Sequence, residues 1–568
     1  MTSTLPSEIL SMVLDNIGED RDYNTLFQCA LASRFLAQHA LVVLYRIYET
    51  SPLRGGGTED EQFKSQTHQP QSRRSIFAST SLKGEQNPTL RKWIILWRSI
   101  VLSTLEAGMT YLPYYTFLRY LDLDDLGNLL GMGNAVKDEL FTPELAEFVS
   151  KDYVVEGNKR RRSARTPPDN EWMKVKLGSA IVRQNPLIRG MSCDVPPSTL
   201  IEWVAGLPQL QSLTLWSGAA LSQQTGENIS SHCHDFKQLT IYSWQDKQQT
   251  TAQADSEDFF NTLRPNSLES FEILSFSDLG PRSIIALGTQ INSLVELKLT
   301  YLNIETIREL PSLGALPRLE VLSLTDSKPT ARNEEFHETV AEVTQWIYSC
   351  MKLKHLTLRK FMDDITLLST VLTSPDIQLT SLTFAGFQLY NRREFLEALG
   401  NQSSLQYLYL RGEGSDDSLD NVQLVSALTM LPNIRDLELK DVSDGFVMEQ
   451  VEILTASLPN LERLWISGEA VNDSIWPAFL NLPKLKGLSI FAFSNFTAKG
   501  VVGFISKLGE GNRGFNLSIM NGMSAHEFLD ETQAMIREVL AEKLDGSFDF
   551  GLAQEEFSEP DSDIDLSD

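Results

Sequence analysis

The sequence predicts an α/β protein with two parts: a small N-terminal helical module, and a long solenoid in which each repeat supplies one strand and one helix. Three observations predict this fold. The apolar pattern L-x-x-L-x-L recurs along most of the 568 residues. Helix-like runs lie between successive copies of the pattern, and a Leu-Pro pair often precedes it. The first 50 residues instead carry apolar side chains at helical spacing.

Composition and charge narrow the class of protein. Apolar residues make up 42% of the chain and charged residues 22%, as in ordinary globular proteins. The net charge is −26, which argues against nucleic acid as a partner because a nucleic-acid-binding surface is basic. Four cysteines are too few for a disulfide scaffold, and no apolar run reaches the ~18 residues of a membrane span. The N-terminal stretch carries Glu8 and Asp15 and does not resemble a signal peptide. We therefore expect a reduced protein of the cytoplasm, the nucleus or both, with no membrane partner.

Three short helices are predicted at the N-terminus. The first runs from about Ser7 to Ile17, the second starts near Asp22 and the third near Ser33. The apolar residues of the first helix are expected to share one stripe formed by Ile9, Leu10, Val13, Leu14 and Ile17. Because three short helices make only a small core, we expect this module to need a partner.

The motifs LPSEIL at residues 5–10, CALASRF at 29–35 and LYR at 44–46 resemble the F-box, particularly that of fungal F-box proteins. The resemblance implies that residues 1–50 form an F-box that binds the Skp-type adaptor of an SCF (Skp–cullin–F-box) ubiquitin ligase, and through it the cullin. It also implies an adaptor-binding face formed by Leu5, Pro6, Ile9, Leu10, Val13, Leu26, Leu31 and Phe35. The alternative is a helical cap on the solenoid, since terminal repeats need caps.

The repeated pattern fits one strand and one helix per repeat. Copies begin at Leu118, Ile188, Leu210, Phe236, Phe271, Leu294, Leu319, Leu353, Leu379, Leu405, Ile434, Leu461 and Leu485. The last twelve span 297 residues in eleven steps, a mean of 27 per repeat. Both leucines of L-x-L face one side of a strand, and the proline of the Leu-Pro pair ends the preceding helix. A single unit cannot bury its apolar face, but stacked units can.

This pattern resembles the leucine-rich-repeat family from about Leu118 to Ile519. The resemblance implies a solenoid with a concave binding face. The alternative is a set of unrelated α/β domains that contain leucine-rich strands.

The domain boundaries follow from shifts in composition. Residues 1–50 are the helical module, and residues 51–90, with GGG at 55–57 and few apolar side chains, are predicted to be a flexible linker. Residues 91–185 are a helical and first-repeat region with a basic insertion, KRRRSAR at 159–165, which is either an exposed loop or a nuclear-localisation signal. Residues 186–545 are the solenoid. Residues 546–568 are predicted to be an acidic disordered tail.

A candidate client-binding site lies on three neighbouring predicted strands. It consists of the aromatic and charged residues Tyr407, Tyr409, Arg411, Glu438, Lys440, Arg463 and Trp465. Strands lie about 4.8 Å apart, so these side chains would form one patch, and aromatic and Arg residues are the usual anchors of protein interfaces. The alternative is that they only pair across the strands and stabilise the sheet. A sparser second candidate is the pair Trp216 and Tyr242.

No catalytic constellation is present in the sequence. It contains neither a phosphate-binding G-x-x-x-x-G-K-[ST] loop nor a G-x-S-x-G nucleophile elbow. The adjacent His232, Cys233 and His234 would point to opposite sides of a strand, so we expect no metal or cofactor there. The predicted function is that of a non-catalytic substrate-recognition subunit of an SCF-type ubiquitin ligase, whose repeats bind a protein client. The alternative is a protein-binding scaffold that recruits no ligase.

Overall fold

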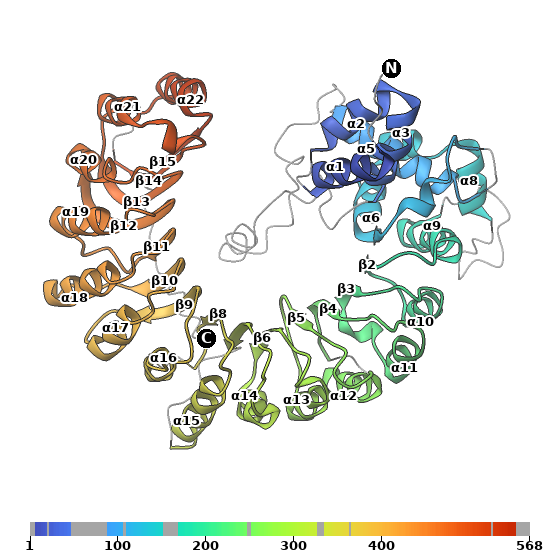
Figure 1. Ribbon diagram of the computed structural model, residues 1–568, viewed down its shortest axis with the longest axis horizontal. Coiled ribbons are helices and arrows are strands. Elements are labelled where there is room, and N and C mark those ends of the chain that lie inside the picture. The colour runs from blue at the N-terminus through green and yellow to red at the C-terminus, as the bar shows by residue number, and fades with distance from the viewer. Residues whose placement is uncertain are drawn as a thin grey trace, which may run out of the picture. The chain divides into compact units, whose positions relative to one another are not determined.

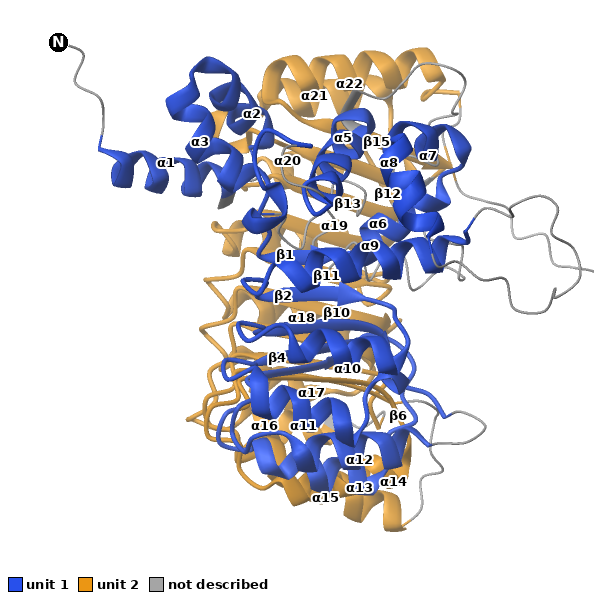
Figure 2. Ribbon diagram, turned by 90° about the vertical axis from the view of Figure 1, so that its right-hand side faces the viewer, with its two compact units in different colours: residues 1–293 blue, residues 294–568 orange. Residues whose placement is uncertain are grey.

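The computed structural model in Figure 1 describes residues 6–19, 22–46, 88–105, 109–151, 168–246, 251–326, 334–362, 365–523 and 526–552. The chain divides into two compact units, residues 1–293 and residues 294–568 (Figure 2). The predicted linker up to residue 87, the basic cluster 159–165 and the acidic residues from 553 onward lie outside the described residues. No helix within the described ranges is both long and apolar enough to cross a membrane.

The N-terminal module of the first unit consists of α1 (Ser7–Glu19), α2 (Tyr23–Ala32) and α3 (Arg34–Leu44). The side chain of Asp22 accepts a hydrogen bond from the backbone N–H of Thr25, and the hydroxyl of Ser33 accepts one from Leu36. These caps explain why α2 and α3 begin where they do. The core between the helices is formed by Leu10, Leu14, Leu26, Ala40 and Val43.

The module is anchored to the helices that follow it. Tyr45, directly after α3, stacks on Tyr114 with 4.3 Å between ring centroids, and its hydroxyl lies 2.7 Å from the hydroxyl of Ser99. Arg46 pairs with Asp15 of α1 at 2.6 Å. The module therefore packs against the rest of the first unit.

The remainder of the first unit alternates helices with parallel strands. The helical elements are α5 (Pro88–Leu102), η2 (Tyr114–Phe117), α6 (Leu123–Gly131), α7 (Asn134–Leu140), α8 (Pro143–Ser150), α9 (Asn170–Gln184), α10 (Pro197–Ala205), η3 (Gly218–Ala220), α11 (Gln223–His232), α12 (Ala252–Thr262), α13 (Pro281–Leu287) and η4 (Gly288–Gln290). The strands are β1 (Tyr120–Asp122), β2 (Gly190–Cys193), β3 (Ser212–Ser217), β4 (Gln238–Ser243) and β5 (Ser270–Ile273), each parallel to the next.

The second unit continues the same alternation. Its strands are β6 (Glu296–Leu302), β7 (Val321–Asp326), β8 (His355–Arg359), β9 (Ser381–Gln388), β10 (Tyr407–Glu413), β11 (Asp436–Lys440), β12 (Arg463–Asn472), β13 (Gly487–Asn495), β14 (Asn516–Gly522) and β15 (Ser547–Leu552), all parallel and in sequence order. Its helical elements are α14 (Ile304–Glu309), η5 (Leu310–Leu313), α15 (Glu334–Tyr348), α16 (Ile365–Leu372), α17 (Arg393–Gly400), α18 (Ser418–Thr429), α19 (Met448–Ser457), η6 (Asp473–Ile475), α20 (Trp476–Phe479), α21 (Ala498–Lys507), η7 (Glu510–Asn512) and α22 (Asp530–Leu544).

In each unit the helices line one face of the strands, and the core lies between helices and strands (Figure 1). The other face of the strands, called the open face below, carries the side chains that alternate with the buried leucines. This is the solenoid of leucine-rich strand-plus-helix repeats that the sequence pattern predicts.

Strand positions follow the predicted pattern closely. At every predicted copy but one, the strand begins two residues after the first apolar residue of the pattern. The exception is Phe271, which already lies within β5 opposite Leu239, so the leading residue of that repeat is Leu268. Strands β14 and β15 were not predicted as copies because Gly514 and Asp545, both with positive φ, stand where the leading leucine is expected.

Two predicted boundaries need correction. Helix α5 begins at Pro88, so the last residues of the predicted linker are helical. Residues 547–552 of the predicted tail form β15, which pairs with β14 and buries Phe548. The alternation in SFDFGL was the sequence signal for this strand, and the acidic residues that follow obscured it.

Candidate functional site

The N-terminal module presents apolar side chains outward as well as inward. Ile9 and Val13 of α1, Leu31 of α2 and Phe35 of α3 are exposed, as is Pro6 just before α1. Met12, which the sequence analysis did not select, is 66% exposed. It follows Ile9 by three residues, and this spacing was the signal that could have found it.

Two residues of the predicted adaptor-binding face lie inside the module. Leu10 and Leu26 belong to the core between the helices, where Leu26 is fully buried. The error came from treating α1 as one apolar stripe. The helix carries two stripes, since Leu10 and Leu14 point inward while Ile9 and Val13 point outward. Leu5 lies outside the described residues.

The exposed face of the module is held in place by a contact between its first and third helices. The hydroxyl of Ser11 lies 3.3 Å from Nδ1 of His39, which joins α1 to α3. The ring of His39 also meets the ring of Phe35 edge-on, with 5.4 Å between centroids. The exposed apolar residues therefore stand on a preformed surface.

On the open face of the second unit, the structure brings all seven predicted client-binding residues onto three neighbouring strands, β10, β11 and β12. Tyr407 lies opposite Asp436, which in turn lies opposite Arg463. In the next outward-facing row, Tyr409, Glu438 and Trp465 lie side by side. This patch is called the β10–β12 patch below.

Hydrogen bonds and ion pairs within the β10–β12 patch occupy several of these side chains. The Tyr409 hydroxyl donates to Oδ2 of Asp436 at 2.9 Å, and Nε of Arg463 donates to the same oxygen at 2.6 Å. Tyr409 is only 9% exposed. The carboxylate of Asp436, a residue outside the predicted client-binding set, joins all three strands. Tyr409 thus stabilises the sheet and offers little surface to a client.

Arg411 and Glu438 form a second closed pair. Nε of Arg411 lies 2.7 Å from one carboxylate oxygen of Glu438, and Nη2 lies 3.0 Å from the other. Both side chains are 13% exposed. Such a two-point pair fixes both side chains and leaves little charge for a partner.

The surface left for contact is mainly aromatic and extends beyond the predicted residues. The half-buried Trp465 stacks on Phe491 of β13, with 5.8 Å between centroids and 19° between ring planes. Phe493, two residues further along β13, is 51% exposed. Met520 of β14 lies opposite Phe491. The sequence signal for the two phenylalanines is the alternation in GLSIFAFSN, which continues past the leucine pattern.

One hollow within the β10–β12 patch is small. The cavity lined by Tyr407, Arg435, Asp436, Glu462 and Arg463 has a volume of about 120 Å³. Pockets for drug-sized ligands usually have volumes of about 300–1,000 Å³. The arrangement therefore suits contact with a protein surface better than enclosure of a small molecule.

The second candidate lies on the open face of the first unit. Trp216 of β3 and Tyr242 of β4 stack in parallel, with 4.1 Å between centroids and 7° between planes. Trp216 remains partly exposed. The pair forms a flat apolar surface.

The sequence His232–Cys233–His234 lies at the end of α11 and not on a strand as assumed. The Cys233 thiol points inward at the carbonyls of Val204 and Leu207, and burial raises the pKa of this thiol to about 12. Among the described residues, no group of three or more His, Cys, Asp or Glu side chains could hold a metal ion.

No family model matches the chain. One solved structure similar to it is that of the Rad7 and Elc1 complex in yeast, with 15% sequence identity and a TM-score of 0.37 over 65% of this chain and 86% of that one. Another is the TLR13–ssRNA13 complex, with 14% identity and a TM-score of 0.35 over 61% of this chain. The match spans about half of that second protein, 47%.

Proposed function

We propose that this protein is the substrate-recognition subunit of an SCF-type ubiquitin ligase. In this proposal α1–α3 are an F-box that binds the Skp-type adaptor, and through it the cullin, while the open face of the solenoid holds a protein client. The observation that carries the proposal is that five apolar side chains of the N-terminal module are exposed, namely Ile9, Met12, Val13, Leu31 and Phe35.

The module has a core of its own, so this apolar face is not explained by folding. Leu10, Leu14 and Leu26 already fill the space between the helices. A partner that covers exposed apolar side chains of this kind gains about 25 cal/mol of favourable free energy per Å² of apolar area buried. In this proposal the partner is a Skp-type adaptor, because the sequence motifs resemble those of an F-box.

The solenoid would contribute by holding the client near the ligase. Trp465, Phe491 and Phe493 form an exposed aromatic surface, and such residues anchor protein interfaces. Binding the client raises the effective concentration of its lysines near the ubiquitin-charged enzyme. In this proposal no residue of the chain makes or breaks a bond.

The adaptor contact is tested by co-purifying the full chain with a Skp-type adaptor. We expect stoichiometric capture by the wild type, and a loss of affinity of at least ~100-fold for the double variant Val13→Asp, Phe35→Asp, because two exposed apolar anchors become charged. The matched control is Ile285→Asp, which charges an exposed isoleucine on α13. It should bind as the wild type does.

Failure of the folded wild type to bind the adaptor would overturn the proposal in favour of the scaffold alternative, in which α1–α3 cap the solenoid. Equal binding by the double variant and the wild type would show that the adaptor binds elsewhere. A thermal transition unchanged from the wild type is required of both variants, and the exposure of all three substituted residues makes this the expected result.

The client-binding part is tested separately with Phe491→Ala and Trp216→Ala. We expect Phe491→Ala to lose proteins that the wild-type complex ubiquitinates, while adaptor binding stays intact. If only Trp216→Ala loses them, the client site lies on β3 and β4. If neither does, the open face does not hold the client.

A further inference from the structure

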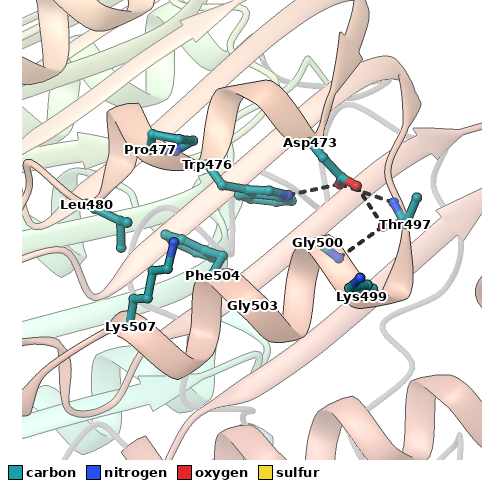
Figure 3. Close-up of a pocket in the computed structure, with 10 residues that line it drawn as sticks. All are labelled: Asp473, Trp476, Pro477, Leu480, Thr497, Lys499, Gly500, Gly503, Phe504 and Lys507. Atoms are coloured by element: carbon teal, nitrogen blue, oxygen red, sulfur yellow. Dashed lines mark hydrogen bonds between the residues drawn. The ribbon is translucent and has the colours of Figure 1, made fainter.

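On the helical side of the second unit, α20 and α21 border a groove of about 350 Å³ (Figure 3). Its floor is aromatic, since Trp476 and Phe504 stack with 4.8 Å between centroids and 19° between ring planes. Pro477 and Leu480 lie along one side, and α21 forms the other. Neither the predicted client patch nor the module takes part in this groove.

Hydrogen bonds fix one end of the groove. Asp473 accepts from Nε1 of Trp476 at 3.0 Å and from the backbone N–H and the hydroxyl of Thr497 at 3.1 and 2.6 Å. Gly500 allows this arrangement, because a Cβ there would overlap the Asp473 carboxylate. The carboxylate is therefore already engaged by three donors, and the groove is preformed.

Three residues of α21, each four positions after the last, line one side of the groove. Lys499 and Lys507 are exposed at the two ends of the row, and Gly503 lies between them. A Cβ at Gly503 would have no atom within 4 Å, so the middle of the groove is open. Neither lysine forms an ion pair with a residue in the described part of the chain. Two cations with no ion-pair partner among the described residues thus flank an apolar gap in a chain of net charge −26.

The register of the last strands brings the end of β15 close to this groove. Leu552 of β15 lies opposite Gly522 of β14, and Gly522 lies opposite Ser494 of β13. Two strand spacings amount to about 10 Å. Ser494 is three residues before Thr497, which lines the groove. The chain therefore leaves β15 near the Lys499 end of the row.

We propose that this groove binds the chain's own acidic segment, residues 553–568. The segment reads AQEEFSEPDSDIDLSD, with seven acidic residues and no basic one. Phe557 enters the gap at Gly503, while Glu555 and Glu559 pair with Lys499 and Lys507. The segment thus occupies the groove as an intramolecular ligand.

The spacing of the two rows supports this pairing. Eight residues of helix separate the two lysines, a rise of about 12 Å. Four residues of extended chain separate Glu555 from Glu559, about 13 Å, and alternation puts Phe557 on the same side midway between them. Pro560 also favours an extended conformation at Glu559. The three residues from Leu552 to Glu555 span about 10 Å, which matches the two strand spacings between β15 and β13.

The test is zero-length carbodiimide cross-linking of the full chain, followed by mass spectrometry. We expect Lys499 and Lys507 to link to Glu555, Glu556 or Glu559. Lys484, an exposed lysine elsewhere in the same unit, serves as the reference and should link at least about tenfold less. A mixture of 15N-labelled and unlabelled chains should give links within one chain only.

Two variants with matched controls test whether the groove is the binding site of the acidic segment. Gly503→Leu fills the groove and favours the helix, so it should fold and reduce the links about tenfold, whereas Gly288→Leu, at another open glycine, should not. Phe557→Ser should likewise reduce them, while Ile564→Ser should not.

Equal linking to Lys484 would overturn the proposal, because it would show only diffuse attraction between the acidic segment and lysines. Links between labelled and unlabelled chains would overturn it in favour of a second copy as the occupant. If the folded Gly503→Leu variant gives the same cross-links as the wild type, the groove is not the binding site of the acidic segment.

Discussion

The N-terminal module and the solenoid bury their apolar residues in different ways. In the solenoid, each strand leucine has neighbours on both sides, as Leu437 has in Leu408 and Leu464, and all three are almost completely buried. In the module, Leu26 is equally buried, but Val13 on the same small domain is exposed. Stacking closes the core of a repeat array, whereas three short helices leave one apolar face uncovered. An exposed apolar residue therefore indicates a partner more strongly in the module than in the solenoid.

The largest expected effect on the free energy of unfolding distinguishes the core of the solenoid from the core of the N-terminal module. Leu437→Ala removes a fully buried side chain between two strands and should lower the free energy of unfolding of the solenoid by about 2–5 kcal/mol. Leu26→Ala should leave the main solenoid transition nearly unchanged and abolish adaptor capture. Urea denaturation followed by circular dichroism measures the first effect. If both variants shift the same transition equally, module and solenoid fold as one cooperative body and the comparison fails.

A smaller effect tests whether the β10–β12 patch is structural at Tyr409. Tyr409→Phe removes the hydroxyl that donates to the buried Asp436 and should cost about 1–3 kcal/mol of stability. The control is Tyr407→Phe, on the same strand and half-buried, which should cost less than ~0.5 kcal/mol. Chemical denaturation measures both. Equal costs would contradict the assignment of Tyr409 to the packing of the sheet.

Tyr45 joins the N-terminal module to the rest of the first unit and should make the free energy of unfolding depend on alkaline pH. Burial is the main cause that raises the pKa of Tyr45 to about 12, opposed by the hydrogen bond with Ser99 and aided by Tyr114. An unfolded tyrosine ionises near pH 10, so the stabilisation is complete below pH 10 and is lost as pH rises toward 12. At pH 11 the loss should be about 1 kcal/mol, and Tyr45→Phe should remove most of it. Burial also raises the pKa of Tyr114, which contributes the remainder.

The matched control for Tyr45 is Tyr111→Phe, because Tyr111 is exposed in the same unit. Stability measured by denaturant between pH 9 and 11 should fall in this control as it does in the wild type. A wild type whose stability does not change over that range would place Tyr45 in contact with water.

The smallest expected difference concerns thiol reactivity, which changes no stability. Cys193, Cys233 and Cys350 are buried in the repeats, and burial raises the pKa of each thiol. Cys29 of α2 is only half-buried. A disulfide reagent at pH 8 should modify one thiol per native chain quickly and all four cysteines after denaturation. Fast modification of a second thiol in the native chain would show that a repeat opens readily.

The sequence predicted the positions of the strands and of the N-terminal helices more accurately than the direction in which their side chains point. The strand positions were predictable because the alternation of buried and outward residues is local. The copy at Phe271 was misplaced because Phe271, Leu274 and Phe276 also fit the pattern, three residues after the true start at Leu268. The three helices at the N-terminus were predictable from their spacing and from the capping residues Asp22 and Ser33. Leu10 was assigned to the wrong side of α1 because hydrophobicity alone does not tell an inward stripe from an outward one.

By itself, the sequence determined the repeat, its period, the identity of its buried leucines and the presence of a helical module before it. These depend on periodicity within a few residues, which the chain carries wherever it folds. Which outward side chains stay available for contact depends on long-range packing, and this became visible in the structure. Asp436 engages Tyr409 and Arg463 from two other strands, while Phe491 keeps an exposed ring beside Trp465. Such pairings join residues about 27 positions apart, and only the register of neighbouring strands brings them within bonding distance.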